Sequence, residues 1–171
     1  MLFQDECHLL NHQVPDVWLA IAGKGALRSV LEQQANELGL QEHVKFLGYV
    51  PDEELSVAYQ AADLTVVPSQ SLEGFGLILL ESLACGTPVL STPVGGMPEV
   101  LLPFQPALVT DTPSSDALAA RLIELLTGEM PLPDRSVCRD YAVRNYDWKI
   151  IAPKVTAVLL MPVDRPVKPK A

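Results

Sequence analysis

The sequence predicts an α/β fold in which a parallel sheet is covered by helices on both faces. Short apolar segments alternate with longer amphipathic segments along most of the chain, and this alternation is typical of strand–helix units. The apolar segments also lack the period of two that marks a strand with one solvated face. Strands of that kind are expected in a parallel sheet that is buried on both sides.

Four short apolar segments are the predicted strands. Each is followed by Gly, Pro or Ser, residues that end a strand in a turn. The predicted strands cover residues 17–22, 44–47, 64–67 and 88–90, with 108–109 as a candidate for a last short strand. Because ligands bind outside the carboxyl ends of the strands in such sheets, we expect a binding site in the loops after Ala22, Leu47, Val67 and Leu90.

Helices are predicted between and after these strands. Gly39 ends the first helix, Asp52 is the expected cap of the second, and Ser114 or Ser115 caps a later one. The predicted helices cover residues 26–38, 52–61, 75–85, 115–126, 134–145 and 148–160.

Composition limits the classes of function. A length of 171 residues fits one domain, and a net charge of −9 argues against a nucleic-acid partner, which needs clustered Lys and Arg. Three widely spaced cysteines without a CxxC pair indicate reduced thiols. Because a signal peptide and a long apolar span are both absent from the sequence, a cytoplasmic location is predicted.

The segment from Ser69 to Val89 contains the residues with chemical potential. Gly74 and Gly76 open a helix with free backbone N–H groups, and a helix start of this kind attracts phosphate. The helix is apolar nearly all round and is expected to be buried, with Glu81 inside it and no cation three or four residues away. A ligand hydroxyl pair would satisfy such a carboxylate. Backbone amides of a neighbouring loop would satisfy it too, and Glu73 could simply complement the helix dipole.

The same segment resembles the signature of the group-one (family 4-like) retaining glycosyltransferases. Glu73 and Glu81 are separated by seven residues, as the two glutamates of that signature are. The flanking residues agree in order, from Gly74-Phe75-Gly76-Leu77 to Ala84-Cys85-Gly86-Thr87-Pro88-Val89. The resemblance covers about residues 15–126 and extends more loosely through Trp148. It implies a GT-B fold, of which this chain would be the Rossmann-like, C-terminal, donor-binding half.

The resemblance also implies a role for each matching residue. Glu73, the candidate catalytic residue, would contact the hydroxyls of the donor sugar, and Glu81 would bind the ribose hydroxyls. The diphosphate would lie at the helix start, and the nucleobase would lie against the loop after the second strand. The donor-binding set is therefore Gly48, Tyr49, Val50, Gly74, Phe75, Gly76, Leu77 and Glu81. The donor is expected to be a nucleotide sugar, with no metal or other cofactor.

The resemblance also shows where the sequence departs from the family pattern. Residues 1–14 are expected to be the remnant of a first helix, so the first strand and the acceptor-binding N-terminal domain are both expected to be absent. Lys24 lies in a different loop from the basic residues that grip the diphosphate in the family. We expect the donor-binding domain over 15–128, C-terminal helices over 129–161 and a disordered tail over 162–171. The chain alone is expected to be inactive, and any membrane contact is expected only through the missing domain.

Two alternatives stay open at this point. One is a non-catalytic module that binds a sugar nucleotide but has lost transferase activity. The other is an epimerase of GT-B fold. The glutamate pair with Phe75-Gly76 between its members favours the transferase.

Overall fold

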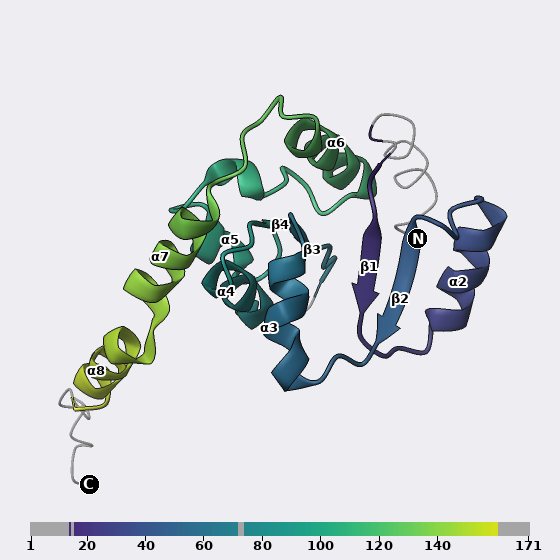
Figure 1. Cartoon of the computed structure of the whole chain (residues 1–171). Coiled ribbons are helices and arrows are strands. Elements are labelled where there is room, and N and C mark those ends of the chain that lie inside the picture. Colours follow the sequence, from purple (N-terminus) through teal and green to yellow (C-terminus); the bar gives the residue numbers. More distant parts are fainter. Residues whose placement is uncertain (1–13, 15, 72–73, 161–171) are drawn as a thin grey trace, which may run out of the picture.

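A computed structural model describes residues 14, 16–71 and 74–160 (Figure 1). The expected disordered tail, most of the expected helix remnant, and Glu73 lie outside the described residues. The strands are β1 (Leu19–Ala22), β2 (Val44–Gly48), β3 (Thr65–Val67) and β4 (Val89–Ser91). The helices are α2 (Arg28–Glu37), α3 (Asp52–Ala61), α4 (Leu77–Ala84), α5 (Met97–Leu101), α6 (Ser115–Leu126), α7 (Arg135–Tyr146) and α8 (Trp148–Leu159), with a 3₁₀ turn at Pro106–Leu108.

The predicted α/β fold is confirmed, and each predicted strand and helix start lies within two residues of the observed one. Two local predictions were wrong, and one helix was missed. Pro51 rather than Asp52 is the N-cap of α3, and the expected last strand is a single bridge between Ser91 and Val109. The short helix α5 was not predicted, although Pro98 in its first turn is a typical helix-start signal.

The described strands form two separate parallel pairs, β1–β2 and β3–β4. Leu19 pairs with Val44 in the first, and Thr65 pairs with Val89 in the second. Within the described residues no strand pairing joins β1 to β3. A Rossmann-like sheet has its first strand in the middle, so this interruption is where the sequence analysis expected a strand to be missing.

The hydrophobic core surrounds the β3–β4 pair. The fully buried residues come from α4, β4, α5 and the turn before Val109, and α6 and α7 complete the cluster. The members with no exposed surface are Leu79, Leu83, Val89, Leu90, Met97, Val100, Leu101, Leu108 and Cys138. This core fixes α4, the helix that carries Leu77 and Glu81 of the predicted site and begins directly after Gly76.

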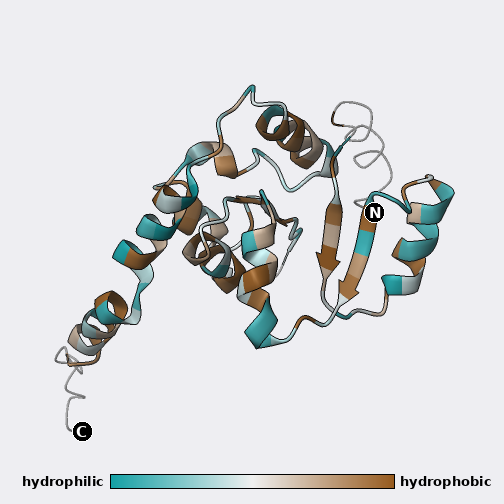
Figure 2. Cartoon of the chain, in the orientation of Figure 1, coloured by the Kyte–Doolittle hydropathy of each residue, from teal (hydrophilic) through white to brown (hydrophobic). Residues whose placement is uncertain are grey.

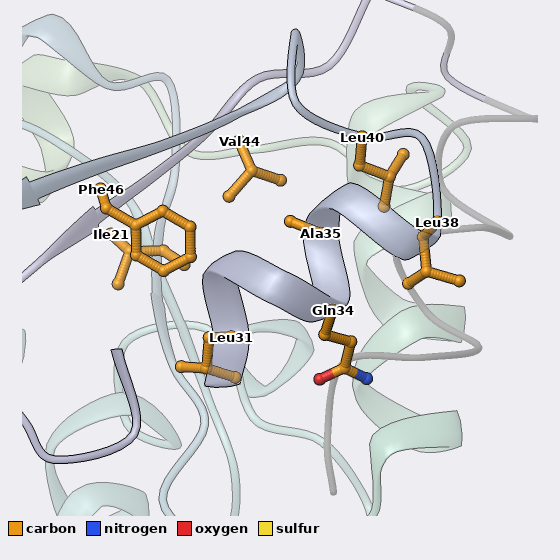
Figure 3. Close-up of a pocket in the computed structure, with 8 residues that line it drawn as sticks. All are labelled: Ile21, Leu31, Gln34, Ala35, Leu38, Leu40, Val44 and Phe46. Atoms are coloured by element: carbon orange, nitrogen blue, oxygen red, sulfur yellow. The ribbon is translucent and has the colours of Figure 1, made fainter. Parts of the chain in front are cut away.

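Among the described residues, helix α2 covers one face of the β1–β2 pair. Ile21, Val44 and Phe46 pack toward Leu31 and Ala35 of α2 around a small apolar cavity (Figure 3). The opposite face, with Lys45 and Leu47 among its residues, is exposed. The expectation that both faces of every strand are buried is therefore right for β4 and wrong for β1 and β2.

Helix α8 is the last helix of the described chain and leads away from the core (Figure 1). It contains no buried residue, and Trp148 and Leu159 are each 78% exposed. Figure 2 shows apolar and polar residues mixed along it. Among the described helices, none has the length and apolar character that a membrane span requires.

Hydrogen exchange tests whether the space between β1 and β3 is empty of a strand. The Leu19 N–H donates to the His43 carbonyl and the Thr65 N–H to the Pro88 carbonyl. Because successive amides in a strand point to opposite sides, the N–H groups of Ala20 and Val66 point away from their partner strands. We expect these two amides to exchange more than about tenfold faster than those of Leu19 and Thr65. Equal protection within each pair would mean that a strand fills the gap.

Candidate functional site

The start of α4 is a helix N-terminus that no side chain caps. Gly76 is its N-cap, in a left-handed conformation with φ of 74°, and no side chain caps the helix. The helix therefore begins at Leu77, two residues later than predicted, because Gly76 turns the chain just before it. The first N–H groups of a helix have no partner inside it and carry the positive end of its dipole. In α4 the Leu79 N–H donates to the Gly76 carbonyl at 2.9 Å, whereas the N–H groups of Leu77 and Ile78 have no backbone acceptor among the described residues.

The loop after β4 holds this helix start in place. The Gly96 N–H donates to the Gly74 carbonyl at 2.8 Å, and a Cβ atom on Gly96 would lie 2.9 Å from that same oxygen. A Cβ on Gly76 would lie 3.0 Å from Cγ of Met97. Only glycine fits such approaches without displacement. The sequence analysis did not predict this close contact between Gly96 and the backbone before α4.

One face of α4 is open to solvent, which corrects the prediction that the helix is buried all round. Leu79, Ser82 and Leu83 are buried, but Leu77 is 65% and Ile78 is 40% exposed. The apolar composition of α4 therefore reflects a buried side together with an uncovered apolar side. The uncovered side lies next to the helix start.

Glu81 was predicted to be buried and without a partner, and both parts of that prediction were wrong. Its side chain is exposed, and the Tyr59 hydroxyl donates a hydrogen bond to its Oε2 at 2.9 Å. Tyr59 belongs to α3, so a search for partners on the same helix could not find it. The unsatisfied carboxylate consequently no longer argues for a ligand, and the case for a ribose contact depends on the position of Glu81 alone.

Burial keeps the Tyr59 hydroxyl in its protonated, donating form. Desolvation raises the pKa of its hydroxyl, and the neighbouring Glu81 carboxylate raises it further. The hydroxyl therefore stays protonated throughout the neutral range. Burial likewise raises the pKa of the Cys85 thiol; the Arg139 guanidinium opposes this shift and Glu81 adds to it.

The loops after β1 and β2 form a second group. The Gly23 N–H donates to the Gly48 carbonyl at 2.7 Å, and Gly48 has a φ of 71° with an Arg28 guanidinium nitrogen 3.1 Å from the place of its missing Cβ. Tyr49 is 61% exposed. The Lys24 ammonium lies 5.0 Å from the centre of its ring, so Lys24 belongs with this loop and not with the helix start.

The structure thus brings the predicted residues into two groups. Gly74, Phe75 and Gly76 lie against the loop containing Gly96 and Met97. Gly48 and Tyr49 lie against the loop containing Gly23 and Lys24. Within the described part of the chain, no three His, Cys, Asp or Glu side chains gather as metal ligands would.

Comparison with known proteins decides the family. Residues 4–145 match the family model for glycosyl transferases group 1. The chain belongs to the group 1 glycosyltransferases. It is 32% identical over 157 residues to the GDP-mannose-dependent alpha-(1-6)-phosphatidylinositol monomannoside mannosyltransferase of Mycolicibacterium smegmatis, with 88% of the chain and 41% of the relative covered. It is 37% identical over 132 residues to the D-inositol 3-phosphate glycosyltransferase of Corynebacterium urealyticum, with 75% and 30% covered.

Solved glycosyltransferase structures share the fold. The sucrose-phosphate synthase of Thermosynechococcus elongatus superposes with a TM-score of 0.69 at 28% identity, covering 91% of this chain and 42% of that protein. HepE from Anabaena in complex with UDP-glucose superposes with a TM-score of 0.68 at 25% identity, covering 89% and 44%. This glycosyltransferase chain thus spans less than half the length of these proteins and corresponds to one Rossmann-like half of a GT-B fold.

The contact between Gly96 and Gly74 can be tested by stability. Replacing Gly96→Ala forces a methyl group against the Gly74 carbonyl, and we expect it to lower the free energy of unfolding by about 1–3 kcal/mol. Gly25→Ala is the matched control, because nothing lies within 4 Å of its Cβ position. Urea denaturation of the three proteins measures the difference. Equal midpoints for both variants would contradict the close packing of these two loops.

Proposed function

We propose that this glycosyltransferase chain is the donor-binding half of a retaining enzyme that transfers a hexose from a nucleoside-diphosphate sugar to an acceptor. The supporting observation is the uncapped start of α4 at Gly76 and Leu77, held by Gly96. A helix start of this form suits a diphosphate. The names of two similar proteins agree with such a donor, since one is GDP-mannose-dependent and another was solved with UDP-glucose.

In this proposal the two groups of residues bind different parts of the donor. The N–H groups of Phe75, Gly76 and Leu77 hold the diphosphate, and Gly48–Val50 contact the nucleobase. Glu81 accepts hydrogen bonds from the ribose hydroxyls. Glu73 contacts the sugar hydroxyls near the anomeric carbon.

The helix start also accounts for the chemical step without a metal. When the sugar leaves its carrier, negative charge develops on the diphosphate. Fixed N–H donors and the helix dipole stabilise that charge better in the transition state than in the bound donor, which lowers the barrier. The acceptor would be brought by a second domain, which would also cover the exposed face of α4 and exclude water.

Binding of nucleoside diphosphates tests the assignment of Glu81. We expect the chain to bind UDP, GDP or ADP weakly, and Glu81→Ala to weaken the preferred one by roughly 1.5–3 kcal/mol, the value of a hydrogen bond to a charged group. Isothermal titration calorimetry measures both affinities. Glu129→Ala, which removes another exposed carboxylate from the residues after α6, is the control. If Glu81→Ala binds as tightly as the parent chain, Glu81 does not contact the nucleotide.

Turnover by residues 1–171 alone distinguishes a half-site from a complete enzyme. We expect no sugar transfer, and donor hydrolysis close to the uncatalysed rate, because the acceptor side of the cleft would come from another domain. Release of nucleoside diphosphate from UDP-glucose and GDP-mannose, measured with and without EDTA, reports on both. Transfer by the purified chain would overturn the half-site assignment, and loss of that transfer in EDTA would overturn the metal-free mechanism.

A further inference from the structure

Tyr59 is the partner that the fold supplies to Glu81. Its hydroxyl reaches from α3 to Oε2 of Glu81 on α4 at 2.9 Å, joining a buried tyrosine to an exposed carboxylate. Resting on the proposed function, in which Glu81 binds ribose, we propose that Tyr59 is a positioning residue that orients this carboxylate and thereby favours ribonucleotides over deoxyribonucleotides. Tyr59 does not itself touch the nucleotide.

The hydrogen bond leaves enough of the carboxylate free for a ribose. An ionised carboxylate has about four acceptor sites on its two oxygens, and the Tyr59 hydroxyl occupies one of those on Oε2. Both oxygens therefore still accept a hydroxyl. Tyr59 therefore does not compete with the ribose for the carboxylate. Its hydrogen bond restrains the Glu81 side chain before the ligand binds, so less rotational freedom is lost on binding. A group that is already oriented binds its ligand more tightly.

The backbone at Tyr59 is held by contacts that do not involve its hydroxyl. The Thr87 hydroxyl donates to the Tyr59 carbonyl at 2.6 Å. The Arg135 guanidinium from α7 donates to the carbonyls of Gln60 at 3.1 Å and Ala62 at 2.7 Å. The end of α3 is therefore fixed through its backbone, and the buried Tyr59 side chain extends from this fixed backbone to Glu81. Removing only the hydroxyl leaves this framework intact.

The backbone of α4 next to Glu81 is also held in place. Ser82, the residue after Glu81, is fully buried, and its hydroxyl lies 2.8 Å from that of Thr65 and 2.9 Å from the Thr87 carbonyl. The backbone of α4 at Glu81 thus has a fixed place against β3. With both backbones fixed, the Glu81 side chain is the movable part, and the Tyr59 hydroxyl restrains it.

The test compares two ligands that differ only in the ribose hydroxyls. Whichever of UDP, GDP and ADP the parent chain binds most tightly is titrated beside its 2′,3′-dideoxy analogue into the parent, Tyr59→Phe, Glu81→Ala and the double variant. We expect Tyr59→Phe to weaken binding of the ribonucleotide by about tenfold, equivalent to about 1.4 kcal/mol, and to leave the dideoxy affinity unchanged. In the Glu81→Ala background the same change should have no further effect.

Tyr141→Phe is the matched control, because it removes a tyrosine hydroxyl that donates to the Val100 carbonyl at 2.7 Å and not to Glu81. It should lower stability without altering the preference for ribose. If the parent prefers ribose through Glu81 but Tyr59→Phe keeps that preference, the positioning role is wrong and the proposed function stands. If Tyr59→Phe weakens both ligands equally, Tyr59 acts on the fold as a whole and the inference is also wrong. A parent chain that does not discriminate the two ligands overturns the ribose contact and the inference together.

Discussion

The attachment of α4 to the β3–β4 pair is the constraint on which the candidate site depends. Apolar packing holds Leu79 and Leu83 in the core, and the buried Ser82 hydroxyl gives the helix a specific position by bonding to Thr65 and Thr87. A buried polar group costs free energy unless it is paired, so this helix cannot slide without breaking those bonds. One rigid element consequently sets both the helix start proposed for the diphosphate and the carboxylate of Glu81, about one turn later.

Most of the fold could be predicted from the sequence because its signals are local. Apolar runs ending in Gly, Pro or Ser mark the strands, and residues such as Gly39 and Ser114 act within one or two turns of the helices they end or begin; the Ser114 hydroxyl accepts from the Ala117 N–H at 3.2 Å. Periodicity says less about what covers a strand. β1 and β2 look as apolar as β4, yet one of their faces is exposed, because coverage depends on which elements lie nearby.

The parts of the site that the sequence analysis missed depend on contacts between distant segments. Tyr59 and Glu81 are 22 positions apart. Gly96 donates its hydrogen bond to Gly74, although α4 and β4 lie between the two residues in the sequence. Neither pairing follows from the spacing of residues on one helix. The glutamate spacing identified the family because it is a property of the sequence itself, whereas the surroundings of Glu81 depend on how α3 packs against α4. The hydrogen-bond partner of a charged residue in an apolar helix can therefore lie on a neighbouring element, as Tyr59 does for Glu81.

The division of the sheet has a consequence for ligand binding. The loop proposed for the nucleobase follows β2, and the helix start proposed for the diphosphate follows β3, while no strand pairing joins the two pairs in the described part of the chain. A nucleotide that contacts both loops would therefore connect two units that the sheet leaves unconnected. Part of its binding free energy would be spent on fixing their relative position. A central strand would supply that alignment in advance, so completing the sheet and binding the donor would stabilise the same arrangement and reinforce each other.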